Sequence, residues 1–275
     1  MDNSSRVPSC IPDLDEIIMG GFPPGSVILL FGDVGAGQNE FAYSTVYKLS
    51  IGIEDPREWG FFIGRRYDHC LIPKELHYIS LSRSKEEITS EIKAGFSEDF
   101  YRKFMKSVSF HDLSPIYFSN SIIPSSWTKD NALFPSKSKD LIGTIIETFQ
   151  KNGPNSLVIL DSLTDVAAYS KLSRDDLITF LKGLRLAAKA WNGVVYLLLT
   201  KDILDKQLET HILDCVDGVL AFEWARHLGA SRRMRYFYIP KFVGVLPHID
   251  SMRIMRFNSI VTANDGFIVL NIEKI

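Results

Sequence analysis

One stretch of the sequence, Ser26 to Ala42, limits the fold more than any other. It opens with an unbroken apolar run, Val27 to Phe31, which is typical of a strand covered on both faces in a parallel sheet. A glycine-rich turn follows, and a helix is predicted from Glu40 to Ser50. The inward N–H groups of such a turn, together with a helix N-terminus, favour the binding of an anion.

The turn has the spacing of a phosphate-binding loop, whose pattern is G-x-x-x-x-G-K-[ST]. Its candidate nucleotide-binding residues are Gly32, Asp33, Val34, Gly35, Ala36, Gly37, Gln38 and Asn39. Gln38 stands where the pattern has a lysine that reaches the β- and γ-phosphates. Asn39 stands where it has a hydroxyl that ligates magnesium. The sequence therefore predicts a backbone anion site without its charged and metal-binding side chains.

The missing lysine is expected to weaken nucleotide binding or to abolish it. A lysine–phosphate contact is a charge-assisted hydrogen bond worth about 1.5–3 kcal/mol. Its loss corresponds to a roughly ten- to hundredfold weaker affinity. Gln38 still offers a neutral N–H donor. ATP or ADP is therefore a candidate ligand, no cofactor is required, and no metal site is predicted.

A second apolar run ends in an acid. Leu157 to Leu160 is followed by Asp161, which is the form of a Walker B strand, whose carboxylate holds magnesium. Because the carboxyl ends of parallel strands share one edge of a sheet, Asp161 is expected beside the phosphate loop. The plainer alternative is that Asp161 and Ser162 cap the helix that follows.

Strands and helices alternate along most of the chain. Further strands are predicted at residues 76–81, 107–111 and 194–199, and helices at 11–18, 84–94, 100–105, 139–151, 173–191 and 204–215. Short β runs with tight turns follow at 219–224, 234–239 and 267–272, which favours antiparallel pairing. The prediction is an α/β fold in three layers, with a mostly parallel sheet, flanking helices and antiparallel C-terminal strands.

We expect one domain over residues 1–275. It divides into an entry segment (1–25), an α/β core (26–217) and a β-rich C-terminal part (218–275). Two long connections interrupt the alternation. Residues 54–74 are predicted as a functional or mobile loop, and residues 114–136, with Trp127, as a polar surface excursion.

Composition limits the partners. The chain of 275 residues has a net charge of −2, so no general attraction to nucleic acid is expected. The basic groups Arg65-Arg66 and Arg232 to Arg235 are interpreted as a solvated hairpin rim or an oligomer contact.

The three scattered cysteines favour a reducing, cytoplasmic location. No apolar run approaches about 18 residues, so no membrane span is predicted. His211 and Cys215 have helical spacing but lack a second ligand pair, so no zinc is expected.

These motifs together resemble the KaiC-like branch of the RecA superfamily of ATPases over nearly the whole chain. The branch's entry motif I-P-x-L-D is present as Ile11 to Asp15, ahead of Gly20-Gly21. Its late K-x-R-G element corresponds to Lys241 to Gly244. The resemblance implies a RecA-like P-loop fold and assembly into rings or filaments that hold nucleotide between subunits.

The departures from this family concern the catalytic groups. Family members carry one or two glutamates just after the second core strand, where they activate water; this chain has Ser82-Arg83. The arginine that acts across a subunit boundary is replaced by Val243, although Lys241 remains as a candidate contact in trans. No catalytic residue is therefore assigned, and Asp161 alone remains of the hydrolytic set.

We therefore expect a catalytically degenerate protein with a regulatory or scaffold role. It would bind ATP weakly or not at all and would assemble with itself and with an unidentified protein partner. One alternative is an active ATPase in which Lys48, Arg65 or Arg83 has moved into the site. Another is a nucleic-acid-binding relative of the recombinases.

Overall fold

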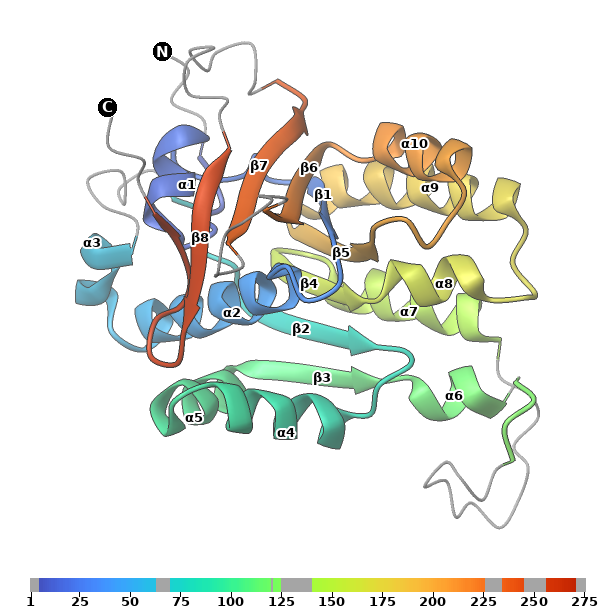
Figure 1. Ribbon diagram of the computed structural model, residues 1–275, viewed down its shortest axis with the longest axis horizontal. Helices are drawn as coiled ribbons and strands as arrows, with labels where there is room; N and C mark the ends of the chain where they lie inside the picture. The colour runs from blue at the N-terminus through green and yellow to red at the C-terminus, as the bar shows by residue number, and fades with distance from the viewer. Residues whose placement is uncertain are drawn as a thin grey trace.

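The computed structural model describes residues 5–62, 70–119, 121–124, 140–225, 234–244 and 256–270. They form a central sheet with helices on both faces (Figure 1). Its strand order is β3-β2-β4-β5-β1-β6-β7-β8-β9. The strands are β1 (Ser26–Gly32), β2 (Glu75–Ser80), β3 (Val108–Asp112), β4 (Ser156–Asp161), β5 (Val194–Thr200), β6 (Gly218–Trp224), β7 (Arg235–Phe242), β8 (Phe257–Thr262) and β9 (Gly266–Leu270).

The phosphate-loop strand β1 lies inside the sheet, between β5 and β6, and pairs in parallel with both. Leu29 lies opposite Leu197 on one side and Val219 on the other. Every residue of β1 is buried, which explains its unbroken apolar sequence. Across the sheet, in the order given above, neighbouring strands from β3 through to β6 pair in parallel. Those from β6 through to β9 pair antiparallel. The predicted sheet, parallel with an antiparallel end, is confirmed.

Helices cover both faces, so the predicted three layers are also confirmed. One core lies between the sheet and α1, α2, α4 and α5, and the other between the sheet and α7 to α10. Leu30 of β1 points into the first core and Leu29 into the second. None of the helices in the described ranges is long and apolar enough to span a bilayer. The helices are α1 (Pro12–Ile17), α2 (Gln38–Glu54), α3 (Trp59–Phe62), α4 (Lys85–Gly95), α5 (Glu98–Ser107), α6 (Ser114–Ser119), α7 (Leu141–Asn152), α8 (Leu163–Ala168), α9 (Arg174–Trp191) and α10 (Lys206–Cys215), with a short 3₁₀ turn at Pro56–Glu58.

Several elements differ from the sequence prediction. The 3₁₀ turn at Pro56–Glu58 and α3 lie in the stretch 54–74 that was predicted as a loop. β8 was not expected, because only Ser259 of its six residues is buried and no apolar alternation marks it. α6 begins the stretch that was interpreted as an irregular surface excursion, and Asp112 starts it by accepting hydrogen bonds from the N–H and Oγ of Ser114. α8 follows β4 directly, at residues that none of the predicted helix ranges covers. Trp127 and Arg65-Arg66 lie outside the described residues.

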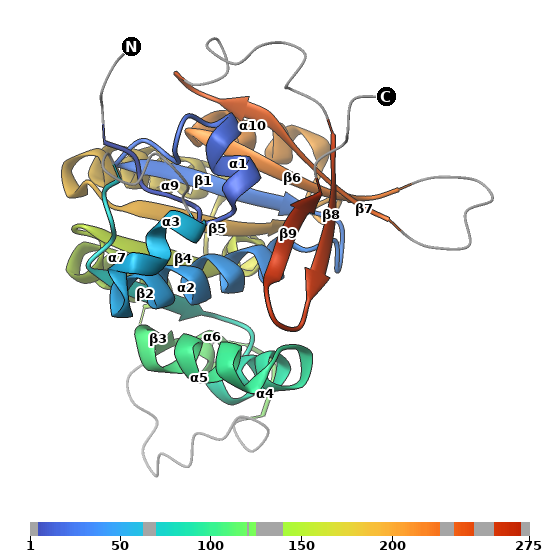
Figure 2. The same ribbon diagram turned by 90° about the vertical axis from the view of Figure 1, so that its left-hand side faces the viewer.

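An aromatic cluster attaches the antiparallel strands to α2. The ring of Phe41 on α2 lies 5.5 Å from that of Phe267 on β9 and 5.6 Å from that of Phe222 on β6. The Phe267 N–H also donates to Ser44 Oγ at 2.7 Å. β9 therefore lies against α2, as Figure 2 shows from the side. This contact fixes the helix that begins at the phosphate loop.

Candidate functional site

The phosphate loop, residues 32–39, connects the end of β1 to the start of α2. Gly35 and Gly37 have φ of 71° and 120°, which are accessible to glycine and strained for other residues. No side chain caps the N-terminus of α2. Its first N–H groups are therefore left for a ligand or water.

The outer side of this loop is held by β6 and β7. The indole N–H of Trp224 donates to the Val34 carbonyl at 3.0 Å, and its backbone N–H donates to Asp33 Oδ2 at 3.1 Å. The Nε of Arg235 donates to the Gly35 carbonyl at 3.3 Å, and its guanidinium lies 4.7 Å from the Trp224 ring centre. These contacts fix the loop carbonyls on the outside, so the loop is preorganised.

Gln38 occupies the interior of the loop. Its residue is 7% exposed, and its Oε1 has no hydrogen-bond partner among the described residues. A Cβ added at Gly32 would lie 2.6 Å from this oxygen, so the amide packs directly over the glycine. The loop therefore contains a neutral amide where an ammonium group would supply charge.

Asp161 lies at the end of β4 in contact with Arg83. Its carboxylate is almost fully buried, and Oδ2 accepts hydrogen bonds from Arg83 Nη2 at 2.5 Å and Tyr78 Oη at 2.7 Å. Arg83 Nη2 also donates to Tyr43 Oη at 3.0 Å, and Nη1 donates to Glu91. Burial opposes the charge of Arg83, yet the Asp161 carboxylate raises the arginine pKa above its usual value. The two side chains form a charge-neutral pair.

The arrangement does not fit a magnesium ion. Mg²⁺ requires octahedral oxygen ligands at about 2.0–2.1 Å, usually with a carboxylate and several waters. The carboxylate available here already accepts two hydrogen bonds on one oxygen, one of them from a cation. Asn39 supplies no hydroxyl. Among the described residues no group of three or more His, Cys, Asp or Glu side chains is placed to hold a metal.

The structure separates the two interpretations of Asp161 and Ser162. Ser162 is the N-cap of α8, since its Oγ accepts from the Asp165 N–H at 3.2 Å. The Asp161 carboxylate contacts Arg83 and Tyr78 instead. The capping interpretation is therefore correct for Ser162 and wrong for Asp161.

Two of the three residues suggested as replacements for the lysine, Lys48 and Arg83, are engaged elsewhere, and Arg65 lies outside the described residues. Lys48 is buried, and its Nζ donates to the Phe267 carbonyl at 3.3 Å. Arg83 contacts Asp161, as described above.

Lys241, the candidate contact in trans, donates to the carbonyls of Leu213 and Asp214, at 3.0 and 2.7 Å, at the C-terminus of α10. A contact of Lys241 across a subunit boundary remains a prediction.

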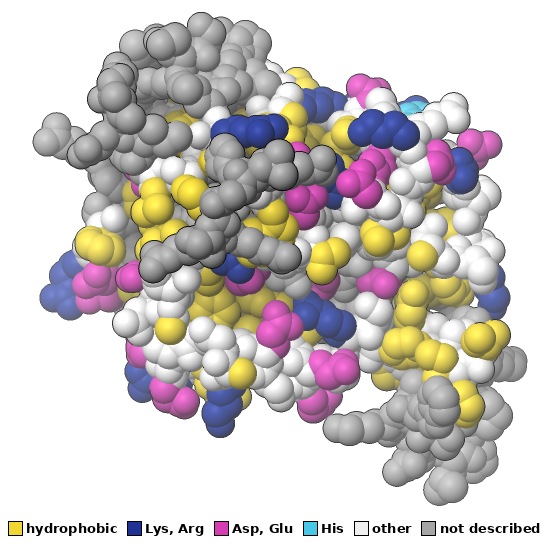
Figure 3. Space-filling model, in the orientation of Figure 1, with side chains coloured by type: hydrophobic (Ala, Val, Ile, Leu, Met, Phe, Trp, Pro, Cys, Tyr) yellow, Lys and Arg dark blue, Asp and Glu magenta, His cyan; other side chains and the backbone are white. Residues whose placement is uncertain are grey.

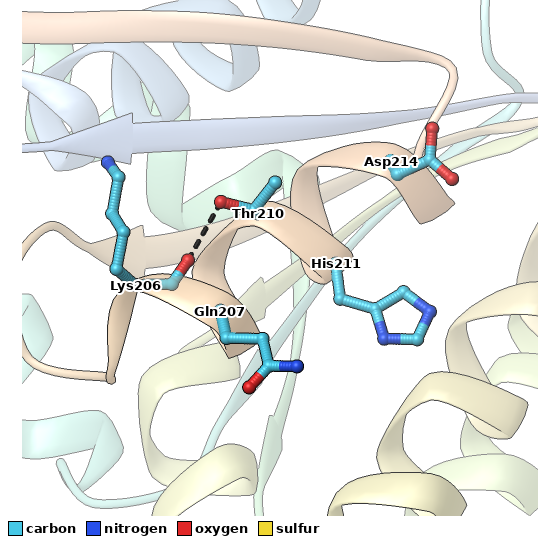
Figure 4. A pocket seen from close by; sticks show the side chains of 5 residues that line it. All are labelled: Lys206, Gln207, Thr210, His211 and Asp214. Atoms are coloured by element: carbon cyan, nitrogen blue, oxygen red, sulfur yellow. Dashed lines mark hydrogen bonds between the residues drawn. The ribbon is translucent and has the colours of Figure 1, made fainter.

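Two of the hollows among the described residues contain residues considered in the sequence analysis, Asp33 in one and His211 in the other. A polar one of about 250 Å³ adjoins the phosphate loop, and Lys201 crosses it to Glu223 at 2.7 Å. The other, about 670 Å³, is an open face of α10 on which Thr210 Oγ1 donates to the Lys206 carbonyl at 2.7 Å (Figure 4). His211 is exposed there whereas Cys215 is buried in the core. The first hollow is lined by Asp33, Lys201, Glu223, Trp224, Tyr236 and Arg256.

Known proteins similar to this chain share its architecture. The KaiC-like protein PH0186 of Pyrococcus horikoshii superposes with a TM-score of 0.62 and 19% identity, over 98% of this chain and 100% of that one. The flagellar accessory protein FlaH of Methanocaldococcus jannaschii gives 0.62 and 16%, over 95% and 96%. The chain has the KaiC/RecA-like P-loop fold.

Comparison of sequences alone shows less similarity to known proteins than comparison of structures does. No family model matches the chain. The UPF0273 protein MJ1359 of M. jannaschii is 39% identical over 51 residues, which is 18% of this chain and 21% of that protein. The match thus spans about a fifth of the relative's length.

Proposed function

We propose that this protein is a KaiC/RecA-like scaffold or regulator that does not hydrolyse ATP and that acts through assembly. The observation that carries this proposal is the pair between Asp161 and Arg83, with an N–O distance of 2.5 Å. Phosphoryl transfer relies on cations at the transferred phosphate and on an oriented water. Here the one retained acid is bound to an arginine, and that arginine stands where a glutamate would orient water.

The remaining substitutions support the same conclusion. The loop lysine is Gln38, the hydroxyl residue is Asn39, and the arginine in trans is Val243. Each removes a different part of the catalytic set, so one compensating residue cannot restore turnover. The alternative of an active ATPase with a displaced cation loses support, because Lys48 and Arg83 both have partners within the fold.

Assembly is the role left to an intact fold with a silent site. Val243 is an apolar side chain with 59% exposure beside Lys241, at the element whose family counterpart lies between subunits. Lys and Arg side chains are interspersed with Asp and Glu on the face in Figure 3, which favours protein contacts over nucleic acid. The three free cysteines support a cytoplasmic role.

The experiment compares the natural chain with a restored triple variant, Gln38→Lys, Asn39→Thr and Arg83→Glu. We expect no phosphate release from Mg-ATP by the natural chain and measurable release by the triple variant, provided that its circular dichroism is unchanged. Light scattering after size exclusion then tests assembly, and a strictly monomeric natural chain with and without ATP would overturn the scaffold role.

A further inference from the structure

We infer that the outer face of helices α7 and α9 is a docking surface for a second copy of this chain, with the helices of the two copies antiparallel. The proposed assembly role concerns Lys241 and Val243, which lie on other elements, so this inference goes beyond it. It follows from an apolar hollow between the two helices, from exposed apolar side chains beside that hollow, and from the order of charges along the helices.

An apolar hollow of about 240 Å³ lies between α7 and α9. Phe149 and Phe180, whose ring centres are 6.4 Å apart, line it together with Trp191. A Cβ added at Gly183, which also lines it, would meet nothing within 4 Å among the described residues. The hollow is several times larger than the roughly 30 Å³ that one water occupies, and its lining offers water few hydrogen bonds. An apolar side chain would therefore fill it better than solvent does.

Apolar side chains beside the hollow are exposed. Leu186 of α9 is 77% exposed and Ile146 of α7 is 39% exposed. Gly183, Leu186 and Ala190 are all exposed and follow one another at intervals of three and four residues, so they lie on one side of α9. The small side chains before and after Leu186 let another helix approach closely. A partner that covers this face would remove apolar surface from water.

The two helices run in the same direction. Each leads through a short turn into one of two neighbouring parallel strands, β4 and β5. At their C-termini, the Asn155 N–H that follows α7 donates to the Trp191 carbonyl of α9 at 2.8 Å. The N-termini of α7 and α9 therefore lie at one end of the face and their C-termini at the other.

Charge is distributed unevenly along these helices. Acids lie at the N-terminal end, where Asp140 precedes α7 and Asp175 and Asp176 occupy the first turn of α9. Basic residues extend from the middle of the helices to the C-terminal end, and Glu147 is the acid among them. These basic residues are Lys151 of α7 and Lys182, Arg185 and Lys189 of α9. The helix pair is thus acidic at one end and basic at the other.

This order of charges identifies a second copy as the occupant. Arg174, at the acidic end, is already paired with Asp205 at 2.7 Å, so it does not cancel the acids there. A two-fold axis perpendicular to the helices places the acidic end of one copy over the basic end of the other. Opposite charges then meet twice, and the antiparallel helix dipoles add to the attraction. A parallel arrangement would bring like charges together.

The area of this face limits the affinity. α9 has 18 residues and is about 27 Å long, and a neighbouring helix lies about 10 Å away. The footprint is therefore roughly 500 Å² per copy, or about 1,000 Å² for both copies, which is the lower limit for a specific interface. We expect a weak dimer with a Kd on the order of 10 μM, which salt weakens further because charges contribute.

The test is sedimentation equilibrium of the full chain without nucleotide, at protein concentrations from about 1 to 300 μM. We expect a monomer–dimer equilibrium whose Kd rises roughly tenfold or more in Leu186→Glu. Ile53→Glu, at an exposed isoleucine of α2 on the opposite side of the sheet, is the matched control and should leave the Kd unchanged. Val243→Glu should also leave it unchanged, because Val243 lies outside α7 and α9.

Two charge-reversed variants test the antiparallel arrangement. One carries Asp175→Lys and Asp176→Lys, and the other carries Lys151→Glu and Lys182→Glu. Lys189 is kept because it is paired within the fold. Each variant alone should be monomeric, since like charges would face each other in its dimer. An equimolar mixture should dimerise, because each reversed end meets its complement, and misfolding of either variant would not give this recovery.

A chain that stays monomeric without nucleotide over this range would overturn the inference. So would a dimer that Leu186→Glu leaves intact, or charge-reversed variants that do not dimerise when mixed. A monomer that binds the apolar dye ANS, with binding lost in Leu186→Glu, would show that a different apolar partner covers this face and would also overturn it. Assembly that requires ATP, or that Val243→Glu abolishes, would leave the proposed scaffold role standing, so the two failures are distinguishable.

Discussion

The guanidinium of Arg83 and the carboxylate of Asp161 form an ion pair at the edge of the sheet where the phosphate loop begins. The N–O distance is 2.5 Å, and Tyr78 donates to the same carboxylate oxygen at 2.7 Å. The acid that the sequence predicted for metal binding is thereby paired with a basic residue of its own chain.

Removing Arg83 should destabilise the fold by about 1–3 kcal/mol, because a buried carboxylate loses its charged partner. The estimate is at the low end for a buried pair, since the arginine side chain is 30% exposed. Urea unfolding of Arg83→Ala, Asp161→Asn and the double variant measures it. The double variant should lose less than the sum of the two single variants; strict additivity would contradict the pairing.

Trp224→Phe should loosen the phosphate loop with little effect on global stability. The substitution keeps an aromatic ring and removes the indole N–H that donates to the Val34 carbonyl at 3.0 Å. We expect faster amide hydrogen exchange at residues 33–37 and unchanged exchange in α9. Unchanged exchange in the loop would show that this hydrogen bond does not hold it.

Gly37→Ala should destabilise the protein by about 1–3 kcal/mol, because φ is 120° and the new Cβ would lie 3.1 Å from the Phe267 ring. Gly183→Ala is the matched control. It lies within α9, where an added Cβ meets nothing within 4 Å, and should stabilise by about 0.5–1 kcal/mol. Thermal unfolding of both variants checks the opposite signs.

Asp15 should make stability depend on pH. Burial raises its pKa from 3.8 to about 7, against hydrogen bonds donated by Ser9 and Cys10. Between these values the folded state binds a proton that the unfolded state has lost, so stability falls as pH rises from about 4 to 7 and then levels off. Asp15→Asn should remove this part of the fall in urea-unfolding curves across that range. A parallel pH profile for the variant would contradict the shift.

Much of the fold could be predicted from the sequence because its central strands are buried on both faces. Val27 to Phe31 and Leu157 to Leu160 read as continuous apolar runs for this reason, and the glycines between β1 and α2 mark the turn. β8 escaped prediction because it is a half-exposed strand whose residues do not alternate. Such a strand depends on its neighbours rather than on its own sequence.

Only part of the candidate site could be predicted from the sequence. The replacement of a glutamate by Arg83 was evident, but its contact with Asp161 joins residues 78 positions apart. It depends on β2 and β4 being adjacent and parallel, with Ser80 opposite Asp161. Arg83 follows three residues after that point. Only the strand order shows that its side chain reaches the acid.

The most direct test is the rate of phosphate release from Mg-ATP by the natural chain and by Asp161→Ala, measured side by side at saturating ATP. Because Asp161 is paired with Arg83 and the loop lysine is absent, we predict identical rates, both equal to that of ATP in buffer. A natural-chain rate clearly above buffer that Asp161→Ala abolishes would show that Asp161 still serves catalysis, and it would contradict the account.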